Sequence, residues 1–203
     1  MTKKRIGIYG GTFSPPHIGH VGAAESFSRA IQPDELIIMP DFLPPHKQLD
    51  GKVSAEDRLE MSRLAFDHIK NVKISDLEIK RGGRSYTSVT LEELSSDESE
   101  LYFLCGTDMF LTLGEWYRPE IIFKLATICF VRREFDVQND HLIEKLKSEY
   151  TEKFGARIIP IDISAREISS SELRLALKNN SPYAREMIPT KVYDYIIRGG
   201  LYK

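Results

Sequence analysis

The sequence has few cysteines and no long hydrophobic run. Its 203 residues include two cysteines, Cys105 and Cys129, and each lies in a short apolar segment with the pattern of a strand. Buried, reduced thiols are the expected state of both, so neither a disulfide framework nor a cysteine nucleophile is predicted. No apolar stretch is long enough to span a membrane. The apolar stretch that follows the basic amino terminus is too short for a secretory signal, and the cytoplasm is the expected compartment.

The chain also lacks a strong charge of either sign. Its formal net charge is −2 and no long run of Lys or Arg occurs, which argues against a broad nucleic-acid surface. A local basic pocket for a small anion remains compatible with this balance. A chain of this length can bury roughly 70 % of its unfolded surface in one core. Because no repeat or linker interrupts the sequence, we predict one domain over residues 1–203.

A glycine turn follows the first apolar run of the sequence. Residues 6–9 read IGIY and residues 10–20 read GGTFSPPHIGH. Gly10 and Gly11 carry no Cβ, so the backbone N–H groups of this turn can approach a polyphosphate closely. The pattern therefore predicts a phosphate site at the end of the first strand.

Two histidines stand where the next helix should begin. Because residues three apart on a helix point the same way, His17 and His20 can face one ligand beside the unpaired N–H groups and the positive end of the helix dipole. Such a pair can also be surface decoration or a metal site. Zinc is disfavoured, because no Cys, Asp or third His lies close enough in the sequence to complete a tetrahedral set. The helix itself is predicted from apolar residues spaced by three and four, namely Ile18, Val21, Ala24, Phe27 and Ile31.

Strand and helix patterns alternate along the rest of the chain, which predicts a parallel sheet. Ser54 with Asp57 and Ser169 with Glu172 have the spacing of capping boxes, and Gly199 and Gly200 should end the last helix. The predicted strands cover residues 6–9, 36–39, 72–79, 101–105, 127–131 and 157–161. The predicted helices cover residues 18–31, 55–69, 88–94, 108–113, 119–125, 141–150, 170–177 and 191–198.

A second phosphate motif is predicted near the carboxyl terminus, where residues 168–174 read ISSSELR. Hydroxyls at a helix start, free N–H groups and the guanidinium of Arg174 one turn later can all bind phosphate oxygens. Serines at a helix start are also ordinary caps. In an open parallel sheet the loops after the strands converge on one crevice, so we expect this segment and the histidine pair to hold the same triphosphate.

Taken together, these motifs resemble the nucleotidyltransferase superfamily with its H-x-G-H and I-S-S-[ST]-x-x-R elements, and more closely the bacterial nicotinate mononucleotide adenylyltransferases. The resemblance runs from residue 4 to residue 202. It includes GGTF and PPH in the first motif, PPHK at 44–47, GGRSYT at 82–87, GTD at 106–108, EWY at 115–117 and IP at 188–189. Two departures are Ser14, where the family usually has Asp, and residues 132–134, which read RRE instead of Arg-Pro-Gly.

The resemblance implies an α/β fold, a Rossmann-like parallel sheet with helices on both faces. It implies that the phosphate of nicotinate mononucleotide attacks the α-phosphorus of ATP and releases pyrophosphate. Mg²⁺ would arrive with ATP, and no protein metal site is expected. The catalytic residues implied are His17, His20 and Arg174. Those for ATP are Gly10, Gly11, Thr12, Phe13, Lys47, Gly106, Asp108, Ile168, Ser170 and Ser171, and those for the acceptor are Thr87, Trp116, Tyr117 and Arg133.

Other functions remain open at this point. A related adenylyl or cytidylyl transferase would share the phosphate motifs and use another acceptor, such as nicotinamide mononucleotide or phosphopantetheine. A non-catalytic nucleotide-binding module would bind ATP without turnover. Neither nucleic acid nor a membrane is an expected partner, and the sequence leaves homo-oligomerisation open because no exposed apolar stripe identifies an interface.

Overall fold

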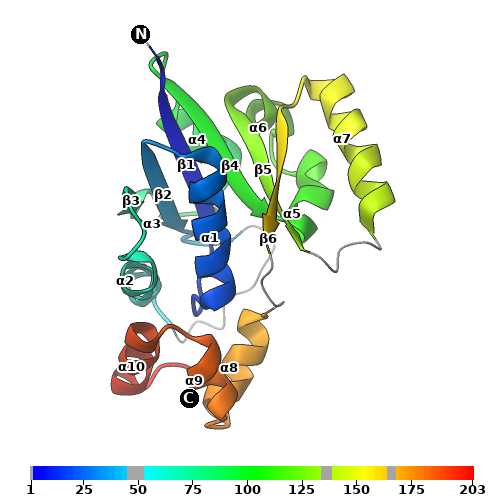
Figure 1. The fold of residues 1–203 in the computed structure, drawn as a ribbon. Helices are drawn as coiled ribbons and strands as arrows, with labels where there is room; N and C mark the ends of the chain where they lie inside the picture. The colour runs from blue at the N-terminus through cyan, green and yellow to red at the C-terminus, as the bar shows by residue number, and fades with distance from the viewer. Residues whose placement is uncertain (1, 45–52, 134–138, 164–167) are drawn as a thin grey trace. The chain divides into compact units, whose positions relative to one another are not determined.

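Six strands form one parallel sheet in a computed structural model that describes residues 2–44, 53–133, 139–163 and 168–203. The strand order is β3-β2-β1-β4-β5-β6 (Figure 1), so the order reverses between β1 and β4. The strands are β1 (Lys4–Gly11), β2 (Glu35–Pro40), β3 (Val72–Ile74), β4 (Ser99–Gly106), β5 (Ala126–Arg133) and β6 (Ile158–Ile163).

Most of the helices lie between successive strands, as the alternating pattern predicts. The helices are α1 (Ile18–Ile31), α2 (Ala55–Phe66), α3 (Leu77–Arg81), α4 (Thr87–Leu94), α5 (Thr107–Thr112), η1 (Leu113–Glu115), α6 (Pro119–Leu125), α7 (Asp140–Phe154), α8 (Ser170–Lys178), α9 (Pro182–Met187) and α10 (Thr190–Gly199). Among the described residues, no helix combines the length and the hydropathy needed to cross a bilayer.

The chain divides into two compact units. The first comprises Met1–Tyr9, Ser26–Ile37 and Tyr86–Ser164, and the second comprises Gly10–Glu25, Ile38–Ser85 and Ala165–Lys203. The first unit thus contains β4, β5, β6 and most of β1, while the second contains β3, α2 and the three carboxy-terminal helices. A single domain over the whole chain stays a prediction.

Helices cover both faces of the sheet in the first unit. Alternate residues of β4 and β5, such as Phe103 and Ile128, join a buried cluster with side chains of α4, α5, α6 and α7. Ile8 of β1 belongs to that cluster, whereas a Cβ on the neighbouring Gly7 would lie 2.9 Å from the ring of Phe27 in α1. Successive residues of a strand point to opposite faces, so α1 packs on the face opposite the cluster. The predicted fold class is confirmed.

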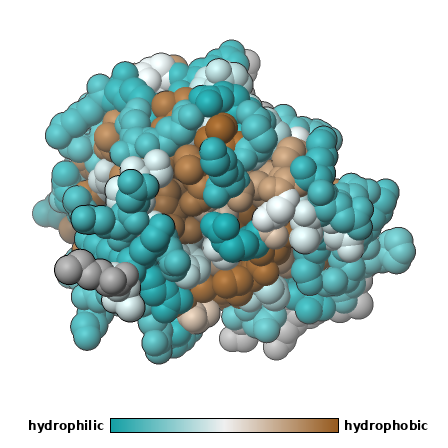
Figure 2. Space-filling model, turned by 90° about the horizontal axis from the view of Figure 1, so that it is seen from above, coloured by the Kyte–Doolittle hydropathy of each residue, from teal (hydrophilic) through white to brown (hydrophobic). Residues whose placement is uncertain are grey.

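The core of the molecule is apolar, while the face seen in Figure 2 is mostly hydrophilic, with hydrophobic side chains showing between the hydrophilic ones.

Both cysteines are buried and unbridged, as predicted. Burial raises the pKa of the Cys129 thiol to about 12 and raises that of Cys105 as well. Neither thiol is therefore ionised at neutral pH.

Some predicted boundaries are wrong. The strand expected over 72–79 ends at Ile74, because the Ser75 hydroxyl accepts a hydrogen bond from the N–H of Leu77 (3.3 Å) and a short helix begins there. Helix α9 was not predicted, although Pro182 at its first turn is a common start signal. Ile18, assigned to the buried face of α1, is 44 % exposed.

The predicted helix ends are mostly confirmed. Ser54 and Asp57 form a reciprocal capping box at the start of α2. Gly200 adopts a left-handed conformation (φ 61°) after α10, as a helix-ending glycine does. At the start of α8, however, the Ser169 hydroxyl accepts a hydrogen bond from the N–H of Ser171. A capping box would require the N–H of Glu172 as the donor, so the predicted box is not formed.

Candidate active site

Two reciprocal hydrogen bonds join His17 and His20 at the start of α1. The carbonyl of His17 accepts the N–H of Val21 (3.1 Å), so His17 occupies the position just before the helix. The N–H of His17 donates to Nδ1 of His20, and the N–H of His20 donates to Nδ1 of His17, each at 3.3 Å. The rings stack with their centroids 3.6 Å apart and their planes 24° apart.

This reciprocal arrangement determines which ring nitrogen carries the proton. Because Nδ1 of each neutral imidazole is an acceptor, the proton must be on Nε2. His17 is 5 % exposed, so its ring is held firmly by its surroundings. The first turn of α1 therefore carries two N–H donors on imidazole rings, next to the positive end of the helix dipole.

Gly19, the glycine of the H-x-G-H element, is part of this arrangement, although no role was predicted for it. A Cβ at Gly19 would lie 3.1 Å from Nδ1 of His17 and 3.7 Å from Cδ1 of Ile168. The first distance is tighter than ordinary van der Waals contact, so a side chain here would require the His17 ring to shift by a few tenths of an ångström. The sequence signal was present, because glycine is a poor helix residue with no other reason to stand in the first turn.

The glycines before the histidines do not form the turn that their residue type suggested. Gly10 and Gly11 are the last residues of β1, and neither has a positive φ. The left-handed residue is Phe13 (φ 48°), whose buried ring would lie 3.0 Å from a Cβ on Gly11. The Phe13 ring also meets the ring of His20 edge-on, with centroids 5.2 Å apart, so this side chain supports a histidine from the core.

The carboxy-terminal motif contacts the loop that precedes the histidines. Nη1 of Arg174 donates to the carbonyl of Ser14 (2.9 Å), and the hydroxyl of Ser170 donates to the carbonyl of Pro15 (3.2 Å). Nη2 of Arg174 donates to the hydroxyl of Ser171 (3.0 Å). The two phosphate motifs, which stand at opposite ends of the chain, are therefore side by side within the second unit.

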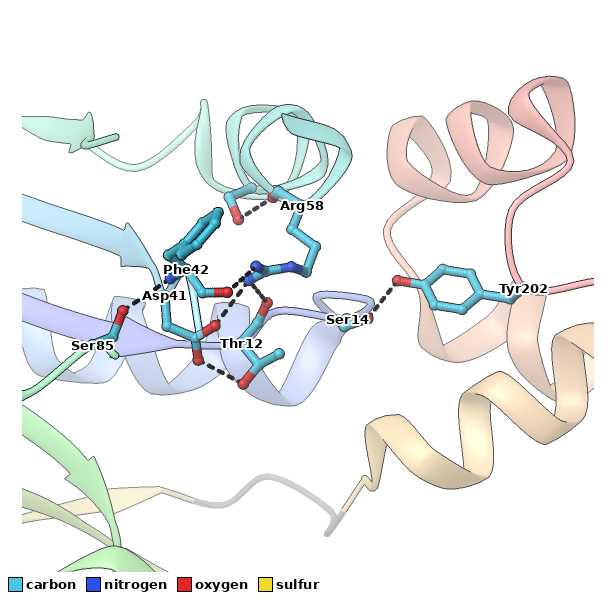
Figure 3. Close-up of polar contacts among 8 residues, drawn as sticks. Thr12, Ser14, Asp41, Phe42, Arg58, Ser85 and Tyr202 are labelled. Carbon is cyan, nitrogen blue, oxygen red and sulfur yellow. Dashed lines mark hydrogen bonds and ion pairs between the residues drawn. The ribbon is translucent and has the colours of Figure 1, made fainter. Parts of the chain in front are cut away.

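A buried arginine also contacts this loop, at Thr12 (Figure 3). Arg58 of α2 is 1 % exposed, and its guanidinium donates to the carbonyls of Thr12 (3.0 Å) and Phe42 (3.1 Å) and to the carboxylate of Asp41 (3.0 Å). The other oxygen of Asp41 accepts from the Thr12 hydroxyl (2.7 Å). The N–H of Phe42 in turn donates to the hydroxyl of Ser85 (2.9 Å). This network joins the segments that follow β1 and β2.

Sequence reasoning missed Arg58 and Asp41. Arg58 lies in the same helix as Arg63, which is half exposed and pairs with Glu60. Nothing in the local pattern distinguishes the two arginines, because both stand among alternating charged and apolar residues. Only the packing of α2 shows which of them is buried.

The residues predicted for the acceptor lie in the first unit. Trp116 is half-buried, donates from Nε1 to the hydroxyl of Thr112 (3.3 Å), and meets Phe103 edge-on with centroids 6.5 Å apart. Tyr117 is 52 % exposed, and its ring lies 4.5 Å from that of Tyr86, which precedes Thr87 at the start of α4.

An ion pair ties these two aromatic segments together within the first unit. Nη1 and Nη2 of Arg118, the residue after Tyr117, donate to the two carboxylate oxygens of Glu92 in α4, at 2.8 and 2.9 Å. The segment that carries Trp116 and Tyr117 is thus held against the helix that carries Thr87.

Two residues predicted to bind ATP also lie in the first unit. Gly106 ends β4, and Asp108 lies exposed in the first turn of α5.

Two predicted site residues are outside this description. Lys47 lies outside the described residues, and the side chain of Arg133 is likewise outside them. Within residues 2–44, 53–133, 139–163 and 168–203, no three His, Cys, Asp or Glu side chains gather in a way that could hold a metal ion.

Comparisons with known proteins agree along nearly the whole chain. The family model described as cytidylyltransferase-like matches residues 8–176. A protein of Caldicellulosiruptor saccharolyticus named "Probable nicotinate-nucleotide adenylyltransferase" is 37 % identical and covers 98 % of this chain and 99 % of its own. A protein of the same name from Carboxydothermus hydrogenoformans is 37 % identical and covers 100 % of both.

A solved structure shares the fold. The nicotinic acid mononucleotide adenylyltransferase of Plasmodium falciparum complexed with NaAD matches with a TM-score of 0.78 at 21 % identity. The match covers 98 % of this chain and 97 % of that chain. At this identity the likeness supports the architecture of the sheet and its helices.

Proposed function

The chain belongs to the cytidylyltransferase-like family, and from this we propose that it transfers the adenylyl group of ATP to nicotinate mononucleotide, giving deamido-NAD and pyrophosphate. Relatives that match over their full length and bear the name of this activity support the proposal. This reaction is a step of NAD biosynthesis. The acceptor is the part of the proposal that the family alone leaves open.

The contact between the two phosphate motifs is the observation that carries the proposal. The guanidinium of Arg174 and the hydroxyl of Ser170 reach the carbonyls of Ser14 and Pro15, in the loop that leads into the histidine pair. Hydroxyl, guanidinium and imidazole donors thus gather around the amino-terminal ends of α1 and α8. Helix N-termini with such donors are suited to a polyphosphate.

The proposed reaction requires little acid–base catalysis by the protein. The acceptor phosphate is already an anion at neutral pH, so no protein nucleophile is needed and no base has to activate it. What remains is alignment of the two phosphates and stabilisation of charge as pyrophosphate leaves. The Nε2–H groups of His17 and His20 are donors of the kind this requires, and His20 is the one proposed to contact the bridging and leaving oxygens.

Arg174, Ser170 and Ser171 are proposed to bind the β- and γ-phosphates, and Ile168 is proposed as a further ATP-binding residue. Mg²⁺ is part of the substrate as Mg-ATP, where it neutralises phosphate charge and keeps mostly water ligands. The backbone from Gly10 to Phe13, together with Lys47, completes the ATP-binding set proposed in the second unit, and the assignment of Gly106 and Asp108 to ATP stays a prediction from the sequence.

Binding of the acceptor is assigned to the first unit. A half-buried indole offers a flat face to a pyridine ring, so Trp116 is proposed to stack on nicotinate. The backbones of Thr87 and Tyr117 are proposed to bind the nicotinate carboxylate, and Arg133 is proposed as a further acceptor-binding residue. The Arg118–Glu92 pair keeps the segments of Thr87 and Tyr117 together.

The test compares acceptors. Purified protein with Mg-ATP should release pyrophosphate much faster with nicotinate mononucleotide than with nicotinamide mononucleotide or phosphopantetheine. Equal rates with all three would overturn the acceptor assignment. Calorimetry on the same sample completes the test, because ATP binding without turnover on any acceptor would identify a nucleotide-binding module instead of an enzyme.

A further inference from the structure

Tyr202, the second-to-last residue of the chain, reaches the nucleotide loop. Its hydroxyl lies 3.0 Å from the hydroxyl of Ser14, and the two side chains point toward each other (Figure 3). Ser14 is also the residue whose carbonyl accepts the guanidinium of Arg174 (2.9 Å). One residue of the loop is therefore held through its side chain by the tail and through its backbone by the proposed phosphate-binding arginine.

The tail is built to present this hydroxyl. After α10 the chain turns at Gly200 (φ 61°), where the N–H of Leu201 returns to the carbonyl of Ile196 (3.0 Å). This is the hydrogen-bond pattern of a closed helix end. Tyr202 itself has a φ of 64°, which tyrosine adopts rarely. Two polar side-chain contacts, together with the buried Val192 and Ile196, hold α10 in place.

Those polar contacts join α10 to α2. The hydroxyl of Tyr195 donates to Asp57 (2.8 Å), and the ammonium of Lys191 pairs with Asp67. Arg58, which holds the carbonyl of Thr12, is on the same helix as Asp57. The tail and the loop are thus fastened to one helix as well as to each other.

We propose that Tyr202 is a positioning residue for ATP, whose hydroxyl sets the orientation of Ser14 and, through the Ser14 carbonyl, that of the Arg174 guanidinium. The inference rests on the proposed role of Arg174 in binding the triphosphate. Tyr202 contacts no reacting atom and takes no part in the chemistry. Burial raises the pKa of its phenol to about 12, so the hydroxyl stays protonated across the pH range in which the enzyme would work.

Tyr202→Phe removes only the hydroxyl and tests this directly. A neutral hydrogen bond of this kind corresponds to about a three- to tenfold change in affinity. We expect calorimetry to show ATP binding weakened by about that factor, with the KM for the acceptor unchanged and kcat within about twofold of wild type. Tyr183→Phe is the matched control, because Tyr183 lies in the same carboxy-terminal region at 36 % exposure and should leave the ATP affinity as it is.

A double-mutant cycle with Ser14→Ala identifies the partner. If the two hydroxyls act together, Ser14→Ala and Tyr202→Phe weaken ATP binding equally, and the double variant is no weaker than either one. Additive losses would refute the coupling, and so would ATP affinity equal to wild type in Tyr202→Phe. A lower Tm with unchanged ATP affinity would show a purely structural contact and also overturn the inference.

The outcome can be separated from that of the proposed function. ATP affinity is measured without any acceptor. If the wild-type protein did not use nicotinate mononucleotide, the acceptor assignment would be overturned, but the effect of Tyr202→Phe on ATP binding could still be measured. Conversely, normal turnover with no change in ATP affinity for the variant would overturn the role of Tyr202 alone.

Discussion

Replacing Arg58 with Met should destabilise the protein strongly. Met keeps an unbranched apolar stem of similar reach, so the change removes the guanidinium and its hydrogen bonds with little loss of packing. The carboxylate of Asp41, whose side chain is 12 % exposed, then loses its charged partner, and the carbonyls of Thr12 and Phe42 lose their donor.

The expected magnitude follows from the burial of the pair. Removing one partner of a buried ion pair costs about 3–5 kcal/mol. Asp41 keeps the hydroxyl of Thr12 as a donor, which places the expected loss near the lower bound, at about 3 kcal/mol. For a chain of this size that corresponds to a fall in Tm of roughly 6–12 °C.

The assay is thermal and urea unfolding followed by circular dichroism, with three comparison variants: Arg63→Met, Asp41→Asn, and the double variant Arg58→Met/Asp41→Asn. Arg63→Met removes an exposed arginine from the same helix and should change the free energy of unfolding by less than about 0.5 kcal/mol. The double variant Arg58→Met/Asp41→Asn no longer leaves a buried charge, so it should be less destabilised than the sum of its single changes by more than about 1 kcal/mol. An Arg58→Met protein as stable as Arg63→Met would refute the reasoning.

Three further predictions concern the histidine turn and the capping box. His20→Ala should lower kcat on the order of 100-fold in a pyrophosphate-release assay, because it removes the proposed donor to the leaving oxygens; near-native turnover would contradict the proposed role. Gly19→Ala should reduce kcat while leaving Tm within a few degrees, since the new Cβ displaces the His17 ring; full activity would show that the stacked geometry is dispensable. Burial tends to raise the pKa of Asp57, but hydrogen bonds from Tyr195 and Ser54 outweigh it and hold that pKa below its usual 3.8. The stability that the carboxylate supplies is therefore complete above about pH 4 and lost as the pH falls further, so the Tm difference between wild type and Asp57→Asn should narrow in acid, and a difference that is constant with pH would count against this.

Local patterns predicted most of the elements, because an amphipathic helix or a buried strand shows its period in the sequence itself. Helix α1 ends at Ile31 and α6 spans Pro119–Leu125, both as predicted. One failure occurred where a polar side chain competed with the pattern. At Ser75 a hydroxyl bond to the backbone ended a strand that the apolar spacing would have continued to residue 79.

The phosphate motifs show both the strength and the limit of this reasoning. Residue type and spacing predicted that the histidine pair and the serine-arginine segment bind phosphate, because both stand at the starts of predicted helices. The same reasoning attributed the turn to Gly10 and Gly11, whereas the left-handed residue is Phe13. A left-handed phenylalanine is held by the packing of its ring, and no local pattern reports that packing.

By itself, the sequence determined the alternation of strands and helices, the two groups of residues predicted to bind phosphate, and the reaction class to which they point. These features depend on residues close together in the chain, whose spacing sets the direction of their side chains. Only the tertiary structure decided that Arg174 contacts Ser14, that Tyr202 joins it, and that Arg58 is buried while Arg63 is exposed. Such contacts join residues far apart in the chain, and they form only when the packing of whole helices brings them within hydrogen-bonding distance.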